Sequence, residues 1–198
     1  MLNSIVYDAD KYKDYKGTPY LWEENKEVII FDRNAKEYNS VIGNYNGLDG
    51  EFEVYKNDRF IRLPPYLYIK IQVINDPAVN YTLYSNIHPK LKNKYCIQHA
   101  QSSNYRVFES FIAKESNTTI QKPGKPAEIK KIIPKSNYFI LAGRALIQFK
   151  LNRKKLIKKF GHKKEIKRFL KENKIKINTI EDVLPLLEFL DSNGWLIP

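Results

Sequence analysis

Cysteine is almost absent from this sequence, and other absences further narrow what the protein can be. Cys96 is the one cysteine among 198 residues, so no disulfide can form within the chain. No apolar run reaches the roughly 18–20 residues that a membrane-spanning helix needs. Residues 1–16 are polar and aromatic and contain no apolar segment of the kind found in a signal peptide. Two compartments stay open: the protein is cytoplasmic, or it is periplasmic or envelope-associated and its signal peptide has been removed.

Motifs that carry catalysis or hold metals are missing as well. The chain contains no glycine-rich phosphate loop, no His-Glu-x-x-His and no Gly-x-Ser-x-Gly. Cys96 and His99 are three residues apart, which places them on opposite faces of a strand, and only His88 and His162 remain as further zinc ligands. We therefore expect no metal site, no cofactor, no catalytic residue and a buried structural role for Cys96. An enzyme with an unfamiliar site between two β-rich segments is the least favoured hypothesis.

Alternation of apolar and polar residues dominates the first three quarters of the chain, and a period of two is typical of strands. The expected strands cover residues 28–31, 38–42, 51–55, 60–63, 66–74, 95–100, 106–112, 138–141 and 145–149. A hairpin turn is expected at 56–59. Residues 76–94 are interpreted as a long loop or part of a short helix. Residues 115–128 contain two prolines and a glycine and are interpreted as an exposed loop.

The period changes to about 3.6 after residue 151, which indicates helices. Two helices are expected near 153–160 and 163–174, and Gly161 is expected to end the first of them. Asn178 or Thr179 is expected to cap a third helix. The fold class is therefore α+β: a mainly antiparallel β body, either a sandwich or a partly open barrel, with two or three C-terminal helices.

These patterns divide the chain into three segments. Residues 1–16 form an irregular N-terminal arm, residues 17–150 the antiparallel β body, and residues 151–198 a basic helical segment. The three aspartates of the arm lack the glycine and the closing glutamate of an EF-hand, so the arm is interpreted as solvated and not as a calcium site.

Positive charge is concentrated in the helical segment. Residues 150–176 contain thirteen basic and two acidic residues, which accounts for +11 of the chain's net charge of +12. Like-charged lysines four residues apart on an exposed helix each cost about 0.2–0.5 kcal/mol. Such a face becomes favourable when phosphates or carboxylates neutralise it. The candidate anion-binding residues are Lys154, Lys155, Lys158, Lys159, Lys163, Lys164, Lys167, Arg168 and Lys171.

The partner of this basic face is open at the level of sequence. Lysine outnumbers arginine, which favours contact with phosphates over base-specific recognition. The helices lack tryptophan and a broad apolar face, so contact with a membrane surface would be electrostatic and weak. An acidic protein is equally compatible. Alternatively, the lysines form a solvated surface that binds no partner. The sequence does not indicate the oligomeric state.

The order of several short motifs resembles a known group of proteins. The motifs are GTPYL (17–21), GLDGEFEV (47–54), FIRL (60–63), NYFI (137–140) and KKLIKKF (154–160). With the later helices, they resemble an uncharacterised family of exported, β-rich Bacteroidetes proteins over about residues 15–190. The resemblance implies a location in the cell envelope and supplies no catalytic or binding residue.

The sequence thus favours a non-enzymatic binding or structural module of the bacterial cell envelope. Its basic helical face would bind an acidic protein or an anionic envelope component. The alternative is a cytoplasmic protein that binds nucleic acid without sequence specificity.

Overall fold

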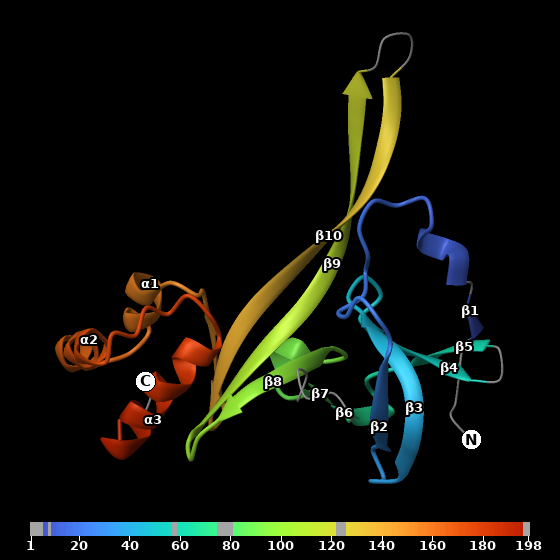
Figure 1. The fold of residues 1–198 in the computed structure, drawn as a ribbon. Helices are drawn as coiled ribbons and strands as arrows, with labels where there is room; N and C mark the ends of the chain where they lie inside the picture. The colour runs from blue at the N-terminus through green and yellow to red at the C-terminus, as the bar shows by residue number, and fades with distance from the viewer. Residues whose placement is uncertain (1–5, 8, 57–58, 75–80, 122–125, 196–198) are drawn as a thin grey trace. The chain divides into compact units, whose positions relative to one another are not determined.

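The computed structural model describes residues 6–7, 9–56, 59–74, 81–121 and 126–195. The fold is α+β, as the sequence predicts, with a mainly antiparallel β body and C-terminal helices (Figure 1). Two compact units make up the chain: Met1–Cys96 with Phe111–Ser136, and Ile97–Ser110 with Asn137–Pro198. Asp8 of the arm and residues 57–58 of the expected hairpin turn lie outside the described residues.

The first unit is built on antiparallel strands in the order β1-β5-β4-β3-β2-β6-β7. Their bounds are Val6–Tyr7 for β1, Lys26–Asp32 for β2, Glu37–Asn46 for β3, Glu51–Lys56 for β4, Arg59–Leu63 for β5, Tyr68–Val73 for β6 and Thr82–Ser85 for β7. The hairpin predicted from alternation is confirmed, because β4 and β5 pair in register with Phe52 opposite Leu63. The region 76–94 contains β7 and the 3-10 turn Pro89–Leu91 among its described residues.

Side chains on one face of these strands form the core of the first unit. Phe52, Val54 and Leu63 are fully buried on β4 and β5. The ring of Tyr45 on β3 lies 5.9 Å from that of Tyr95, in an edge-to-face arrangement. Burial raises the pKa of the Tyr45 hydroxyl well above its usual value. The first unit therefore has an aromatic interior, in which both rings serve packing.

A network of polar side chains occupies the opposite face of β3, β4 and β5. Asn46, which is fully buried, donates from Nδ2 to Glu53 Oε1 at 2.9 Å and to Tyr12 Oη at 3.0 Å. Tyr12 Oη donates to Asp49 Oδ2 at 3.1 Å, and Arg62 Nη2 lies 2.9 Å from the same oxygen. The unit thus pairs its buried charges internally, as burial requires.

One expectation from the sequence is wrong in this unit. Residues 115–121 and 126–128 continue β9 (Tyr105–Gln121) and β10 (Pro126–Ala142) and do not form a loop. The two strands are neighbours in the sheet, and their backbone groups hydrogen-bond to each other. This pairing favours strands in a polar segment whose side chains alone do not predict them. Pro126 stands at the first position of β10, where a proline is tolerated.

The N-terminal arm, expected to be irregular, contains two short elements among its described residues. Its residues Val6–Tyr7 form β1, which pairs with β5, and Ala9–Tyr12 form a 3-10 turn. The edge of β5 offers unpaired backbone groups, and a short strand without a clear sequence period can satisfy them.

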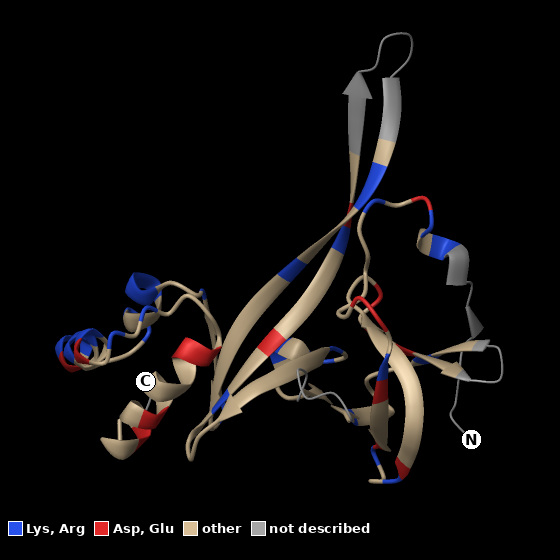
Figure 2. Ribbon diagram, in the orientation of Figure 1, with Lys and Arg blue, Asp and Glu red and all other residues tan. Residues whose placement is uncertain are grey.

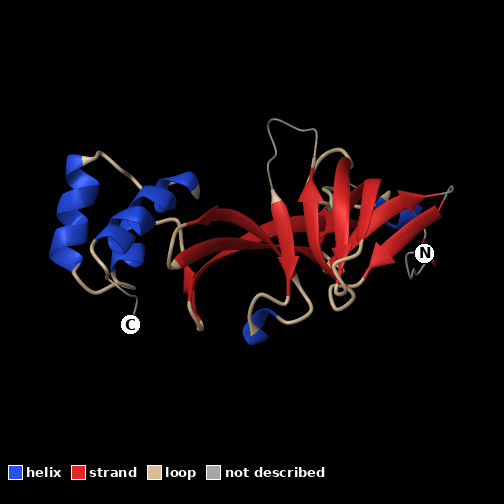
Figure 3. Cartoon of the chain, turned by 90° about the horizontal axis from the view of Figure 1, so that it is seen from below, coloured by secondary structure: helices blue, strands red, loops and turns tan. Residues whose placement is uncertain are grey.

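The second unit combines strand segments with all the described α-helices (Figure 3). Its elements include β8 (Tyr95–Gln101) from Ile97 onward, the start of β9, the end of β10, β11 (Ala145–Phe149), α1 (Arg153–Ile157), α2 (Lys163–Glu172) and α3 (Leu184–Ser192). A 3-10 turn, Glu181–Val183, leads into α3. Gly161 does not end the first helix: α1 ends at Ile157, with Lys158 at its C-cap.

Candidate anion-binding face

Seven of the nine predicted basic residues lie on two short helices, and Lys158 and Lys159 follow directly after the first of them. Each helix begins at an identifiable residue. Asn152 caps α1, because its Oδ1 accepts the backbone N–H of Lys155 at 3.0 Å. His162 precedes α2 in the left-handed conformation, with φ of 49°. Arg153 connects the helices, since its Nη2 donates to the carbonyl oxygen of Lys167 at 3.0 Å.

Apolar side chains fix the orientation of both helices within the second unit. Leu156 of α1 and Ile166 and Leu170 of α2 are fully buried. They join one hydrophobic core with residues of the strands, among them Ile140 of β10 and Phe149 of β11. Because one face of each helix is buried, the intervening charged residues are turned to solvent.

The structure places every predicted anion-binding residue at the surface. All nine are exposed: Lys154, Lys155, Lys158, Lys159, Lys163, Lys164, Lys167, Arg168 and Lys171. Within the described part of the chain, none of these side chains forms an ion pair. The two helices are therefore covered by cations that the described fold does not neutralise (Figure 2).

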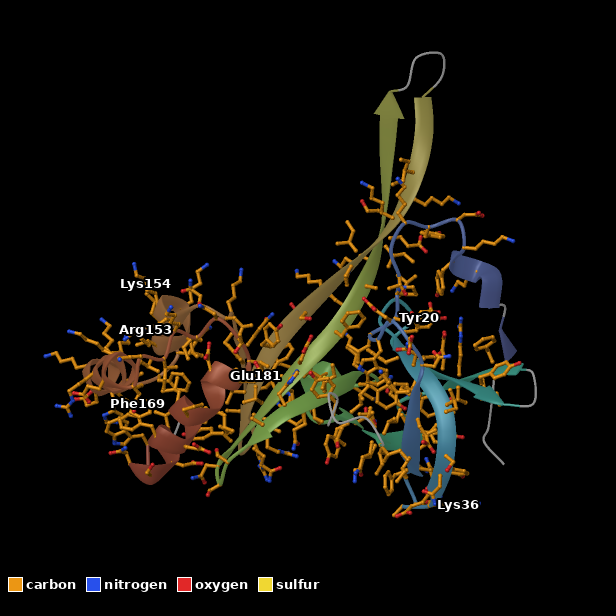
Figure 4. All side chains as sticks on the ribbon, viewed as in Figure 1. Tyr20, Lys36, Arg153, Lys154, Phe169 and Glu181 are labelled. Carbon is orange, nitrogen blue, oxygen red and sulfur yellow. The ribbon has the colours of Figure 1, made fainter. Side chains whose placement is uncertain are left out.

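A first hollow, of about 690 Å³, is lined by residues of α1 and α2. Its lining consists of Arg153, Lys154, Ile157, Lys158, Lys163, Lys167 and Lys171. Ile157 is the one apolar member, and it is 3% exposed. An anionic group in this hollow would meet basic side chains of both helices. Figure 4 labels Arg153 and Lys154 at this part of the molecule; the Arg153 guanidinium is directed to α2, where it bonds the Lys167 carbonyl oxygen, and Lys154 is exposed.

A second hollow, of about 540 Å³, lies where the end of β11 meets α1. Its lining consists of Gln148, Phe149, Lys150, Lys155, Lys158 and Lys159. Lys158 lines both hollows, so the two are adjacent around α1. Lys164 and Arg168 line neither of them. Lys150 and Arg153, which were not among the nine predicted residues, line one each.

Four carboxylates of the second unit lie on α3 or in the turn before it, apart from Glu165 and Glu172 on α2. Glu188 and Asp191 lie on α3, and Glu181 and Asp182 lie in the turn before it (Figure 2). Asp182 Oδ2 accepts the backbone N–H groups of Asn178 at 2.7 Å and Thr179 at 3.0 Å. These hydrogen bonds, that from Thr179 first, hold the pKa of Asp182 below its usual value. Asn178 and Thr179 were predicted to cap the third helix with their side chains. Instead, their backbone N–H groups donate to the Asp182 carboxylate.

Two aromatic stacks, which the sequence did not reveal, lie beside α2. The exposed ring of His162 stacks on Trp195 with centroids 4.0 Å apart, and Phe169 stacks on Phe189 at 4.1 Å. Phe189 also meets Trp195 edge-on at 5.5 Å. Trp195 follows α3 and is more than thirty positions from His162 in the sequence, so no local period could have paired them.

The other candidate features of the sequence can be located among the described residues. Across the described ranges, no group of three or more His, Cys, Asp or Glu side chains is arranged to hold a metal ion. Cys96 is fully buried. No described helix combines the length and the apolar character that crossing a bilayer requires.

Comparison of the chain with protein-family models, with curated proteins and with solved structures gave no match.

Proposed function

We propose that this protein is a non-enzymatic binding module of the bacterial cell envelope, and that the α1–α2 face binds an anionic partner. One observation carries the proposal: the nine exposed cations form no ion pair with any described residue, although they crowd two short helices. Like-charge repulsion at this density costs stability unless an external anion offsets it.

The arrangement of the cations favours an extended anion over a single small one. Lys158 is shared by the two hollows, so basic side chains line a surface on both sides of α1. Lysine is a flexible, strongly hydrated point charge, which suits repeated phosphates or carboxylates better than one rigid ligand. An acidic polymer or an acidic stretch of a protein fits this description.

Insertion into a membrane has no support in these helices. The large hydrophobic residues of the described chain that are exposed are Ile42, Tyr55, Tyr66, Ile69 and Ile133, and all lie outside α1 and α2. The envelope location rests on the resemblance of the motif order to exported β-rich proteins.

Charge reversal tests the proposal. The variant Lys158→Glu/Lys159→Glu/Lys163→Glu/Lys167→Glu should lower the affinity for polyglutamate and polyphosphate at least about a hundredfold, because each contact contributes a salt-dependent Coulomb term. Binding by the unmodified protein should fall steeply as salt rises from about 50 to 200 mM. Fluorescence anisotropy with labelled polymers measures both effects.

A matched control separates the basic face from overall charge. Lys13, Lys90, Lys92 and Lys94 are exposed in the first unit, and reversing them changes the net charge by the same amount. This control variant should retain most of the affinity. Equal losses in both variants, or no binding of either polymer at about 50 mM salt, would refute the proposal.

A second candidate, binding of single-stranded nucleic acid, is favoured by one observation. The exposed His162 ring stacks on Trp195 next to Lys163 and Lys164, and a base can stack on such a platform while lysines contact phosphates. This candidate predicts that single-stranded RNA binds more tightly than polyphosphate of equal charge, and that His162→Ala removes the difference. The envelope proposal predicts no such preference.

A further inference from the structure

A separate pocket lies in the first unit, on the face of β3, β4 and β5 that is opposite the aromatic interior. Its volume is about 440 Å³. Its lining consists of Tyr20, Glu23, Glu24, Asn25, Asn44, Glu53, Tyr55 and Phe60. Asn44 and Glu53 are register partners on β3 and β4, and Tyr55 and Phe60 are partners on β4 and β5. The floor of the pocket is thus a rigid part of the sheet.

Hydrogen bonds hold one wall of the pocket in place. Asn44 Nδ2 donates to the carbonyl oxygen of Trp22 at 2.9 Å, and Asn44 Oδ1 accepts the Trp22 backbone N–H at 3.2 Å. The backbone N–H of Leu21 donates to the backbone carbonyl oxygen of Tyr45 at 3.0 Å. These contacts bring Tyr20 over β4, where its hydroxyl donates to Glu53 Oε2 at 2.8 Å (Figure 4). Glu23 and Glu24 follow directly at the rim.

The lining is negative although the chain as a whole is strongly positive. It contains three carboxylates and no Lys or Arg. Glu53 is 3% exposed and is fixed by Asn46 and Tyr20, with Arg62 Nε 3.7 Å away on its other side. Glu23 and Glu24 are exposed, and neither forms an ion pair or side-chain hydrogen bond with a described residue.

Aromatic rings form the remaining wall. Tyr55 is 44% exposed, and its ring lies 5.1 Å from that of Phe60 in a tilted arrangement. Ile42, the register partner of Tyr55 on β3, is also 44% exposed. Ligand pockets are commonly lined by aromatic side chains together with a few polar groups. Aromatic faces attract ammonium and guanidinium groups and also pack against apolar stems.

We propose that this pocket binds an organic cation, namely an alkylammonium or guanidinium group carried on an apolar stem. The exposed carboxylates of Glu23 and Glu24 at the rim attract the charge, and the aromatic wall covers the stem. Glu53 is paired within the sheet and fixes the shape of the floor. A neutral sugar would stack on the rings and donate hydroxyl hydrogen bonds to the carboxylates, but it would not gain the charge attraction that a cation gains. The same group occurs on free diamines and on lysine or arginine side chains of peptides.

Calorimetric titration of the full chain with 1,5-diaminopentane and with a short lysine-containing peptide tests the proposal. At least one of them should bind, and the affinity should fall with salt. Tighter binding of the diamine identifies a free amine as the ligand, and tighter binding of the peptide identifies a protein segment. Glu23→Gln/Glu24→Gln should weaken binding about tenfold, since the rim charges act at close range. Both residues are exposed, so the variant should fold normally.

Controls make the test specific and independent of the proposed function. Glu37→Gln/Glu115→Gln removes two exposed carboxylates outside the pocket and should leave the affinity unchanged. Tyr55→Ala should weaken binding, and polyanion binding should be unaffected by any of these substitutions. The inference is overturned if neither cation binds, if the rim variant binds as well as the unmodified protein, or if glucose binds as tightly as the diamine.

Discussion

The two units of this chain treat their charged side chains in opposite ways. In the first unit, Glu53, Asp49 and Arg62 lie close together and share hydrogen bonds with Asn46 and Tyr12. In the second unit, nine cations cover α1 and α2 and form no ion pair with a described residue. Charges that are paired within the fold contribute to stability, whereas charges left unpaired are available to a partner. The difference therefore directs the search for function to the helices and to the rim of the negative pocket.

The largest change in stability is expected from a substitution in the hydrophobic core beneath the basic face. Leu170→Ala removes a fully buried side chain of α2 and should lower the free energy of unfolding of the second unit by about 2–5 kcal/mol. Polyanion binding should fail on heating before diamine binding in the first unit does. Denaturant titration measures the loss, and Lys171→Ala, on the same helix but exposed, should change little. Equal destabilisation by both would contradict the assignment of the buried face.

Removing one residue of the hydrogen-bonded network in the first unit should lower stability more than removing one lysine of the basic face. Asn46→Ala leaves the buried Glu53 carboxylate without one hydrogen-bond donor and should cost about 1–3 kcal/mol. Thermal unfolding followed by circular dichroism measures this cost. Asn34→Ala, at an exposed turn, is the control and should be nearly neutral. A neutral Asn46→Ala would show that the network contributes nothing to stability.

A pH-dependent contribution is expected from the turn before α3. Asp182→Ala removes the acceptor for two backbone N–H groups and should cost about 0.5–2 kcal/mol near neutral pH. The pKa of Asp182 is lowered in the folded state, so its contribution is present above the unfolded value of about 3.9 and is lost as the pH falls through the lowered one. Stability curves of variant and unmodified protein should converge in acid; Asp14→Ala serves as the exposed control. Curves that stay parallel down to about pH 2 would contradict the role of the carboxylate.

The smallest expected change is a gain in stability. Lys167→Gln relieves repulsion with Lys163 and Lys171 on α2 and should stabilise the second unit by about 0.4–1 kcal/mol at low salt. The gain should vanish at about 1 M salt, where charges are screened. Lys176→Gln, outside the helix, provides the comparison. A loss of stability on removing Lys167 would mean that this lysine has a partner within the fold.

Local patterns predicted most of the elements of the fold. Strict alternation identified β4, β5 and β6, and the change of period near residue 151 identified α1 and α2, because each pattern reflects which side chains are buried. The nine exposed cations were predicted for the same reason, since the buried stripe of Leu156, Ile166 and Leu170 leaves the lysines outside. Their role as an anion-binding site stays a prediction.

Contacts between distant parts of the sequence could not be predicted in this way. Residues 115–121 of β9 and 126–128 of β10 show no apolar alternation in the sequence, and their pairing as neighbouring strands is what makes them extended. The stack of His162 on Trp195 and the pocket around Glu53 join segments with no common period. In each case the tertiary fold, and not the local sequence, brings the residues together.

Gly47 has a consequence for how this sequence can vary. A methyl group at this position would lie 2.6 Å from the Phe111 ring, closer than real atoms approach. The carbonyl oxygen of Gly47 accepts the backbone N–H of Ala113 at 2.9 Å, which holds the glycine in this place. A bulkier residue is therefore admissible only when the aromatic ring is replaced by something smaller. Homologues should show these two positions covarying, a small residue at one accompanying the large ring at the other.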